Sequence, residues 1–495
     1  MNAQEYKRNY NWVIGLESIQ FKFTKNNIVI DTLNNLDQKQ FPFVYSFNSN
    51  SSISDTLGNL SFFSIGFTLY NSSGNYIKNG LDINSPLGNI LNNFYGGISV
   101  FEQTDIIIPK KNNQYYVIGT GMSDAVADKY IQHIETKFDV LNYSIVDMDG
   151  NGGKGEVTVK NKIIAQNQNY SSTAITATKH ANGKDWWLVK EDANNFGFQV
   201  FLVTEDTILG PYFQLVSQHG GKAFTLFSKI NCSYDGSKIC GNLYWDLDSA
   251  GNFKSYRTDV YNFDRCSGSI NDFNTYYIPL DTSSFKSWDH LYGSNFSPDS
   301  KLLYINSFYN IWQVNMANDN IQHIHGMDTI ESRFPWYNMI GIGANGKMYV
   351  GNQSGMRKYM SYIDKPNEIG LACDFKAQGV WQPFTNLMCP PNMPNYGLGA
   401  LAGSACDTIR AVPQNWLLYP NPASNNIAIK IPNSKQGASL QLQVYNLLGQ
   451  KIIDKQVLIS VDYEAILDVA SLARSIYIIK AKYGNEEFIS KFVKE

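Results

Sequence analysis

The chain is poor in charged residues and has no long run of either sign. Its 495 residues include 40 Lys and Arg and 43 Asp and Glu, so the net charge is −3 and the isoelectric point is about 6.1. Nucleic acids and anionic membranes are bound through basic patches, which argues against both as partners. No window approaches the roughly 18 consecutive apolar residues that a transmembrane helix needs.

The sequence also lacks the short motifs that mark common catalytic sites. It has no GxSxG, HExxH, P-loop or GxGxxG context, so the usual nucleophile, zinc and nucleotide sites are not indicated. No Cys-x-x-Cys pair or Cys/His spacing suggests a zinc site. Carboxylates that converge from separate parts of the chain would leave no such motif. An enzyme is therefore not excluded, although a non-enzymatic role is favoured.

Cysteine is scarce and even in number, which fits an oxidising compartment. Six cysteines allow fifteen disulfide pairings. Cys232 and Cys240 flank a turn that contains Asp235-Gly236, so one hypothesis joins them across a hairpin. The alternative is that the thiols are buried and unbonded. The six are Cys232, Cys240, Cys266, Cys373, Cys389 and Cys406.

Helical periodicity is nearly absent before Thr408. Aromatic residues make up 14% of the chain, and short apolar runs alternate with Gly, Asn, Asp and Ser turns, which is typical of a large all-β domain. A weak repeat begins near residues 180, 233, 297 and 343, and each copy places Asp or Asn with Gly or Ser before an apolar run. A spacing of roughly fifty residues is typical of four-stranded β-propeller blades.

The repeat predicts a β-propeller of about seven blades over residues 5–405, followed by a linker at 406–415. We expect the apolar run after each turn to be an inner strand that is packed between neighbouring blades. We also expect an early strand to complete the last blade, which would bring the N-terminus to the region near Gln378–Pro383. Two stacked β-sandwiches are the alternative architecture.

The last part of the chain predicts a separate module. Pro420 and Pro422 fix an extended entry, and alternating runs such as Ile427–Ile431 and Ile476–Ala481 predict strands with one buried face. Leu448-Gly449-Gln450 is a turn signal between two such runs. Residues 416–495 are therefore expected to form a small Ig-like β-sandwich.

The motifs of this module resemble, in their order, the type A C-terminal sorting domain of proteins exported by the type IX secretion system in Bacteroidota. That family usually has Gly before the Tyr-Ile-Ile stretch, where this chain has Ser475-Ile476. The resemblance implies that the type IX secretion machinery is a partner and that the protein is secreted or displayed on the outer-membrane surface. The residues that carry it include Leu418, Tyr419, Pro420, Asn421, Pro422, Tyr445, Leu448, Gly449 and Tyr477.

The body resembles the WD-like or gliding-associated propellers that precede such tails in Bacteroidota proteins. The shared segments include Tyr143–Met148, His180–Trp187 and Tyr261–Gly268. This resemblance implies a fold and a location but no activity.

The start of the chain shows no secretory leader, because polar residues follow Met1 directly. Asn2-Ala3-Gln4 is similar to the small-residue end of a cleaved leader, so we expect a mature chain. A cytoplasmic protein is the alternative, and it conflicts with the sorting tail.

Asp147, Asp149 and Asn151 place oxygen ligands at alternating positions, as at the start of a calcium-binding loop. With Asp147 as the first position, the twelfth is Thr158 instead of the bidentate Glu. A Gly-rich blade connection is therefore favoured over a calcium site, and no cofactor is expected.

Trp186 and Trp187, with His180 and Asp185 nearby, suggest a sugar-stacking or acid–base site. Alternation along a strand would turn one ring inward and the other outward, and an outward ring is a suitable carbohydrate platform. A structural role for the pair is the favoured alternative.

Together these features favour a secreted, surface-displayed propeller that binds an extracellular glycan or protein. One alternative is a secreted carbohydrate-active enzyme with its active site at the propeller channel. Another is a structural part of the gliding or envelope machinery.

Overall fold

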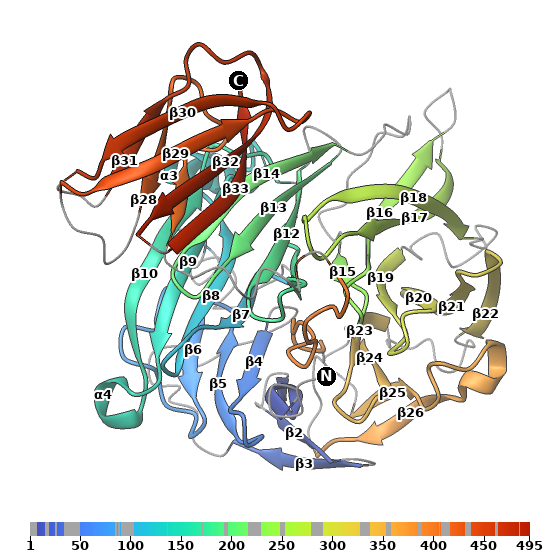
Figure 1. Cartoon of the computed structure of the whole chain (residues 1–495). Coiled ribbons are helices and arrows are strands. Elements are labelled where there is room, and N and C mark those ends of the chain that lie inside the picture. The colour runs from blue at the N-terminus through green and yellow to red at the C-terminus, as the bar shows by residue number, and fades with distance from the viewer. Residues whose placement is uncertain are drawn as a thin grey trace. The chain divides into compact units, whose positions relative to one another are not determined.

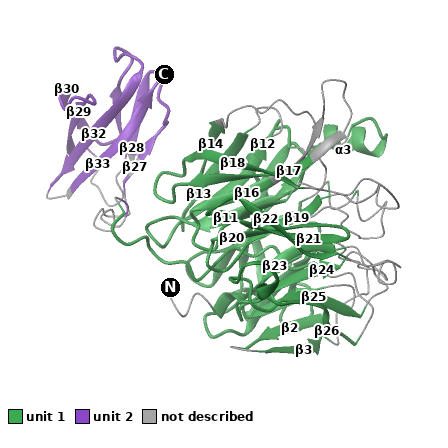
Figure 2. Ribbon diagram, turned by 90° about the vertical axis from the view of Figure 1, so that its right-hand side faces the viewer, with its two compact units in different colours: residues 1–404 green, residues 405–495 purple. Residues whose placement is uncertain are grey.

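Short antiparallel strands joined by tight turns make up most of the computed structural model. It describes residues 7–495 except 15–18, 25–26, 34–49, 85–86, 88–89, 91–102, 136, 171, 193–196, 216–228, 248–252, 279–290, 327–336, 353–357, 384–388, 405, 407–415, 431–436, 461–463 and 485. The predicted linker thus lies almost entirely outside the described residues. The chain divides into two units, residues 1–404 and 405–495, which Figure 2 colours separately.

The described part of the first unit contains seven sheets, each a meander in which consecutive strands pair. Two sheets have three strands and five have four. In chain order the sheets are β1 (Asn11–Ile14), β2 (Ile19–Phe23) and β3 (Ile28–Thr32); β4 (Asn50–Ser54), β5 (Leu60–Ile65) and β6 (Thr68–Asn71); β7 (Asp105–Pro109), β8 (Gln114–Gly121), β9 (Val140–Asp147) and β10 (Glu156–Ala165); β11 (Ile175–Lys179), β12 (Trp186–Asp192), β13 (Gly197–Val203) and β14 (Ile208–Leu215); β15 (Ile230–Cys232), β16 (Lys238–Leu247), β17 (Phe253–Phe263) and β18 (Ile270–Ile278); β19 (Leu291–Phe296), β20 (Leu302–Ser307), β21 (Asn310–Asn315) and β22 (Asn320–Gly326); and β23 (Tyr337–Ile342), β24 (Met348–Asn352), β25 (Tyr359–Ile363) and β26 (Phe375–Trp381).

The sheets form a closed ring. The first strands of neighbouring sheets contact each other in the order β4, β7, β11, β15, β19 and β23 (Figure 1). Trp12 in the first sheet closes the ring, because its side chain packs against Tyr349 of the last sheet with ring centroids 5.6 Å apart. The fold is therefore a β-propeller, and its seven sheets match the predicted number of blades. Two stacked sandwiches are excluded.

The repeated turns join the first and second strands of a blade. In the turn after β15, the Ser233 hydroxyl donates to the Asp235 carboxylate (2.6 Å), and Gly236 takes a φ of 73°. The turn after β19 repeats this arrangement with Ser297, Asp299 and Ser300, whose φ is 61°. The apolar run after each turn is therefore the second of the four strands, and β12, β20 and β24 are buried along their whole length, as expected for a strand packed between neighbouring blades.

The centre of the ring is occupied by residues 389–404, which we call the central segment; it follows the last blade and is orange in Figure 1. The backbone N–H of Asn392 donates to the Asn50 carbonyl (2.9 Å). Its side-chain amide donates to the carbonyls of Asp105 (2.9 Å) and Ile175 (3.0 Å). The Tyr396 hydroxyl donates to the Ile107 carbonyl (2.7 Å). The central segment thus joins three blades that precede it by more than 200 residues.

The first sheet lies beside the first strand of the second sheet and is tied to the central segment. β1 runs opposite to β4, because the Ser52 hydroxyl donates to the Asn11 carbonyl (3.0 Å) and the Asn50 amide donates to the Val13 carbonyl (2.7 Å). Just before β1, the Asn9 side chain donates to the Pro394 carbonyl of the central segment (3.2 Å). The last sheet consists wholly of residues 337–381, so the expectation that an early strand completes it was wrong.

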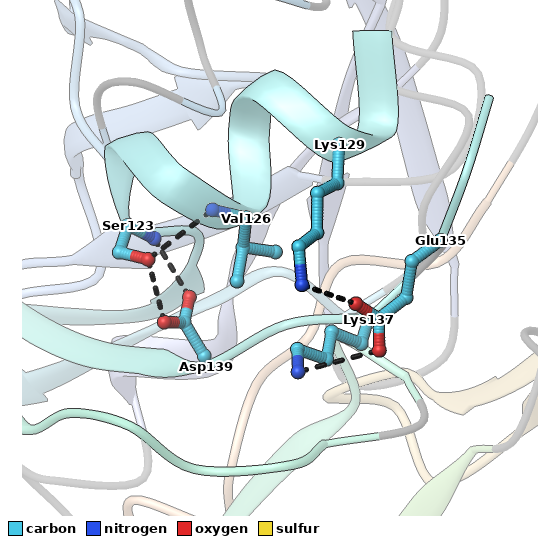
Figure 3. A network of polar contacts seen from close by, with 6 residues as sticks. All are labelled: Ser123, Val126, Lys129, Glu135, Lys137 and Asp139. Atoms are coloured by element: carbon cyan, nitrogen blue, oxygen red, sulfur yellow. Dashed lines mark hydrogen bonds and ion pairs between the residues drawn. The ribbon is translucent and has the colours of Figure 1, made fainter. Parts of the chain in front are cut away.

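Helices are few and short in the described residues. The eight-residue helix α3 (Asp124–Ile131) leaves the third blade between β8 and β9, and its first turn is capped by the Ser123 hydroxyl (Figure 3). Asp139 accepts hydrogen bonds from the Ser123 backbone N–H (2.7 Å) and hydroxyl (2.6 Å), which ties the helix start to the blade. Among the described residues, no helix is long and apolar enough to cross a membrane. The other helical turns are η1 (Lys7–Asn9), α4 (Gly150–Gly153) and η2 (Gly370–Cys373).

The second unit is a two-sheet sandwich, consistent with the expected Ig-like module. Alternate residues of its strands point into one apolar core, in which Trp416 stacks on Phe488 and Tyr477 on Phe492. One sheet has the order β27 (Leu417–Tyr419), β28 (Asn426–Lys430) and β31 (Glu464–Asp468), and the other has β30 (Lys451–Leu458), β29 (Ser439–Tyr445), β32 (Ser475–Tyr483) and β33 (Glu486–Lys494).

Cys266 and Cys406 are disulfide-bonded, whereas Cys232, Cys240 and Cys373 are free thiols. The hypothesis that Cys232 bonds to Cys240 is wrong. In the β15–β16 pair Cys232 lies opposite Ile239, and Cys240 lies opposite Asn231, so the two side chains point to opposite faces of the sheet. Burial raises the pKa of both thiols to about 12.

The central segment predicts a specific loss of stability. Asn392→Ala removes the donor for two buried carbonyls, and an unsatisfied buried polar group costs about 1–3 kcal/mol. We expect the free energy of unfolding to fall by about 2–4 kcal/mol, measured from the guanidinium midpoint by tryptophan fluorescence. Asn320→Ala, at an exposed asparagine of β22, is the control and should change little. Equal midpoints for the two variants would contradict the role of Asn392.

Candidate functional site

The Leu418–Pro422 motif joins the beginning of the second unit to its end. The Asn421 side chain donates to the Lys491 carbonyl (3.1 Å) and accepts from the Val493 N–H (2.8 Å). The Tyr419 hydroxyl donates to the Glu464 carboxylate of β31. Leu418 is half-buried against the core, and the two prolines are exposed. The motif therefore holds the entry strand against the last strand of the module.

The Tyr445–Gln450 motif forms the tip of the β29–β30 hairpin. Asn446 accepts hydrogen bonds from the N–H groups of Leu448 (3.0 Å) and Gln450 (3.0 Å), and Gly449 takes the positive φ of 78° that the turn requires. Leu448 is 84% exposed. Tyr445 donates to the Gln443 amide oxygen (2.8 Å) on the same strand. The tip thus presents apolar side chains to solvent on a well-defined turn.

Tyr477, in contrast, belongs to the core of the module. It is 6% exposed, stacks on Phe492, and donates to the Ala473 carbonyl (3.0 Å). Of the nine predicted sorting residues, Leu418, Tyr419, Asn421, Tyr445 and Tyr477 are buried or hydrogen-bonded within the sandwich, whereas Pro420, Pro422 and the turn at Leu448-Gly449 are exposed.

Trp186 and Trp187 are both buried in the propeller, at 2% and 5% exposure. Trp186 packs against Tyr396 of the central segment, with ring centroids 5.7 Å apart. Trp187 faces the next blade, where its Nε1 donates to the Arg265 carbonyl (2.8 Å). The expectation of one outward ring assumed that one face of the strand meets solvent, but neighbouring sheets cover both faces of β12. Neither ring offers an open face to a sugar.

The side chains of His180 and Asp185, in the turn after β11, each bond to Asn182 and do not form an acid–base pair. The His180 Nδ1 accepts from the Asn182 N–H (3.0 Å), while the Asp185 carboxylate accepts from the Asn182 amide (2.7 Å). Burial lowers the pKa of His180, although the nearby Asp185 charge opposes this effect. The imidazole is therefore a neutral acceptor that shapes the turn.

Asp147 and Asp149 are engaged by amide donors of the third blade. Asp147 accepts from the Gln114 side chain (3.0 Å) and the Asp149 N–H (3.0 Å), and Asp149 accepts from the Asn113 side chain (2.7 Å). Asn151 lies in the α4 turn with a φ of 52°. In the described parts of the chain, no three His, Cys, Asp or Glu side chains gather as metal ligands.

The middle of the ring leaves little space. A cavity of about 60 Å³ lies beside the central segment, lined by residues that include Asn231, Asn295 and Asn392. A volume of this size holds a few water molecules, whereas small-molecule sites usually have about 300–1,000 Å³. This cavity is therefore too small for a sugar ring.

Sequence reasoning missed Arg265, which fastens the central segment. Arg265 is 5% exposed, and its guanidinium donates to the carbonyls of Lys179 (2.8 Å), His180 (3.4 Å) and Gly399 (2.5 Å). An isolated Arg after a strand gives no such signal in the sequence. The density of Pro and Asn in residues 390–395 is the one feature that could have drawn attention to the segment.

Sequence reasoning also missed two buried lysines. Lys190 Nζ donates to the carbonyls of Ser172 (2.6 Å) and Ala174 (2.9 Å), and Lys229 Nζ donates to the Tyr292 carbonyl (3.1 Å). Burial lowers the pKa of both amines. Both side chains are enclosed by the blades, so they serve packing and hydrogen bonding.

The His180 environment predicts a pH dependence of stability. Because the pKa of His180 is lowered in the folded state, the unfolded chain binds the proton more tightly, and stability present above about pH 6.5 is lost as the pH falls. We expect His180→Gln to show a smaller loss than the wild type between about pH 7.5 and 5.5, measured by guanidinium midpoints. Lys184→Ala, in the same turn, should keep the wild-type dependence. An unchanged dependence in His180→Gln would rule out this role.

Comparison with known proteins identifies the second unit. Residues 417–495 match the family model described as a secretion system C-terminal sorting domain. A search of curated proteins finds no match.

Solved structures similar to the chain include three with low sequence identity. Apo AztD from Citrobacter koseri has 9% identity, covers 76% of this chain and 85% of its own, and gives a TM-score of 0.37. A protein from Lactobacillus plantarum has 11% identity, coverages of 75% and 90%, and a TM-score of 0.33. The extracellular domain of a putative hybrid two-component system from B. thetaiotaomicron has 10% identity, coverages of 98% and 57%, and a TM-score of 0.36.

The export assignment thus rests on the tail. Its family match and its sandwich fold agree with the motif order in the sequence. The chain carries a C-terminal sorting domain, which implies export to the cell surface or the medium.

Proposed function

We propose that the protein is a binding or adhesion module that the type IX secretion machinery of Bacteroidota exports and displays on the cell surface. The observation that carries the proposal is the sorting-domain match at residues 417–495. The motif residues support it, since they build one coherent sandwich with an exposed turn at Leu448. The extracellular partner is a glycan or a protein.

The structure of the body supports a binding role on its outer surface. The central segment fills the middle of the ring with bonded side chains such as Asn392 and Tyr396. Propellers with a filled centre retain their loops and outer strands as contact surfaces. The small central cavity gives no support to the alternative of a carbohydrate-active enzyme with its active site in the channel. No specific observation favours a structural role in gliding or envelope machinery.

The proposal predicts that the tail is needed for display and that the body folds without it. A chain that lacks residues 416–495 should remain in the periplasm with a folded body. Protease accessibility on intact cells would measure its location, and the thermal unfolding of the purified body would measure its folding.

Two full-length variants test whether the tail must be folded, and not only present, for display. Phe492→Asp places a charge in the sandwich core, where Phe492 is fully buried, and should abolish display. Lys455→Ala, at an exposed residue of β30, should leave display unchanged. Surface display of the truncated chain would overturn the proposed route of export.

A further inference from the structure

The surface of the sorting domain is rich in apolar side chains. Many of the large apolar residues that are exposed among the described residues belong to the second unit, although it is much shorter than the first. Leu447 and Leu448 are 63% and 84% exposed, and Ile476 and Val493 are 42% and 39% exposed. Exposed apolar residues that gather in one place usually mark an interaction site, so their arrangement on the module matters.

Two of these residues form a cross-strand pair. Ile476 of β32 lies directly opposite Val493 of β33. Their sequence neighbours Tyr477 and Phe492 point into the core of the sandwich. Because successive side chains of a strand point to opposite faces, Ile476 and Val493 lie together on the outer face of the sheet.

The hairpin tip lies at the same end of the sheet as this pair. Tyr445, the last residue of β29, lies opposite Ile478 in the antiparallel neighbour β32. The chain continues from Tyr445 to Leu447 and Leu448, away from the middle of the sheet, and Ile476 precedes Ile478 on that side. The tip and the cross-strand pair therefore share one end of the module.

The Leu418–Pro422 motif reaches this end from the edge of the sheet. Asn421 bonds to the backbone of β33 on both sides of Phe492, at residues 491 and 493. Its two proline neighbours are exposed. The separate sequence motifs of the module thus meet at one place. We call the exposed apolar residues there the apolar end: Leu447, Leu448, Ile476 and Val493.

Two cations border the apolar end. Arg474 directly precedes β32, and Lys491 lies on the outer face of β33, two residues before Val493. Both side chains are exposed, and neither forms an ion pair with any residue that the structure describes. By contrast, Lys480 on the same face pairs with Glu487 (2.7 Å). Free cations at this border favour a partner surface that carries carboxylates.

An apolar centre with a basic border fits an acidic protein pocket or an anionic lipid surface, and the local structure favours the protein. Asn446 fixes the tip by accepting hydrogen bonds from the N–H groups of Leu448 and Gln450. Side chains that are already ordered bind a complementary pocket at a lower entropic cost. Binding to lipid depends on the apolar area that is buried and needs no fixed geometry, so four side chains on a fixed framework suit a pocket better.

We propose that the apolar end is the surface by which the type IX export machinery recognises the folded tail, through an apolar pocket bordered by carboxylates. The inference rests on the proposed function and adds to it the residues and the chemistry of recognition. The sorting residues that are buried or bonded within the sandwich then serve its fold.

The test measures surface display of full-length variants in the native host, by protease accessibility on intact cells. Leu447→Ser with Leu448→Ser should lower display roughly tenfold, because a polar anchor gains little from burial in an apolar pocket. Ile476→Thr with Val493→Thr should lower display by a similar factor for the same reason. Lys491→Glu should also lower display, since it sets a carboxylate against carboxylates. Leu447→Met with Leu448→Met keeps the surface apolar and should be displayed like the wild type.

The matched control is Leu458→Ser with Ile466→Thr. These residues are 68% and 56% exposed, but Leu458 lies at the far end of β30, opposite the first residue of β29, and Ile466 lies in the other sheet. The control should be displayed like the wild type. The tail of every purified full-length variant should resist limited proteolysis as the wild-type tail does, because all the changed side chains are exposed.

Four outcomes would overturn the inference. They are wild-type display of either polar double variant or of Lys491→Glu, an equal loss of display in the control, loss of protease resistance in the tail of a polar variant, and failure of the Met variant to be displayed. Binding of the purified wild type to phosphatidylglycerol vesicles, lost in the polar variants, would also overturn it and would indicate a lipid partner.

The chain that lacks residues 416–495 separates this inference from the proposed function. If that chain stays in the periplasm while a polar variant is displayed, the apolar end is rejected and the proposed function stands. If that chain is itself displayed, the proposed function is rejected.

Discussion

The propeller depends on hydrogen bonds between the central segment and the inner strands. The inner strands of a ring have backbone carbonyls that face its middle, and a buried carbonyl without a donor is costly. Asn392 supplies three donors there through its backbone and side chain, and Tyr396 supplies a fourth. Arg265 then fixes the segment to the turn after β11. The central segment thus holds the inner strands of the ring together. In many propellers the ring is instead closed by one sheet that combines strands from both ends of the chain.

Local chemistry explains why the blades could be predicted from the sequence. The turns around Asp235 and Asp299 need a Ser–Asp hydrogen bond and a residue with positive φ, and these requirements leave a visible pattern with a fixed spacing. The sandwich could be predicted for a similar reason, since its strands alternate between a core and a solvent face.

Long-range contacts explain what could not be predicted. Residues 390–394 have no periodicity, and the bond from Asn392 to Asp105 spans 287 residues. The burial of both Trp186 and Trp187 follows from two covering sheets, which alternation within one strand does not reveal. Cys232 and Cys240 could not be assigned from the sequence, because a shift of one residue in the pairing of β15 with β16 decides whether their side chains share a face of the sheet.

The position of the central segment late in the chain has a consequence for folding. Contacts between residues far apart in sequence form slowly, because the loop between them must close first. Asn9 donates to the Pro394 carbonyl across 385 residues, so the first blade cannot reach its final packing until nearly the whole body has been synthesised. The nascent body therefore remains open and incompletely packed for most of its synthesis. Ring closure is therefore the last step in the folding of the body, because the carbonyls of the inner strands wait for the donors of residues 389–404.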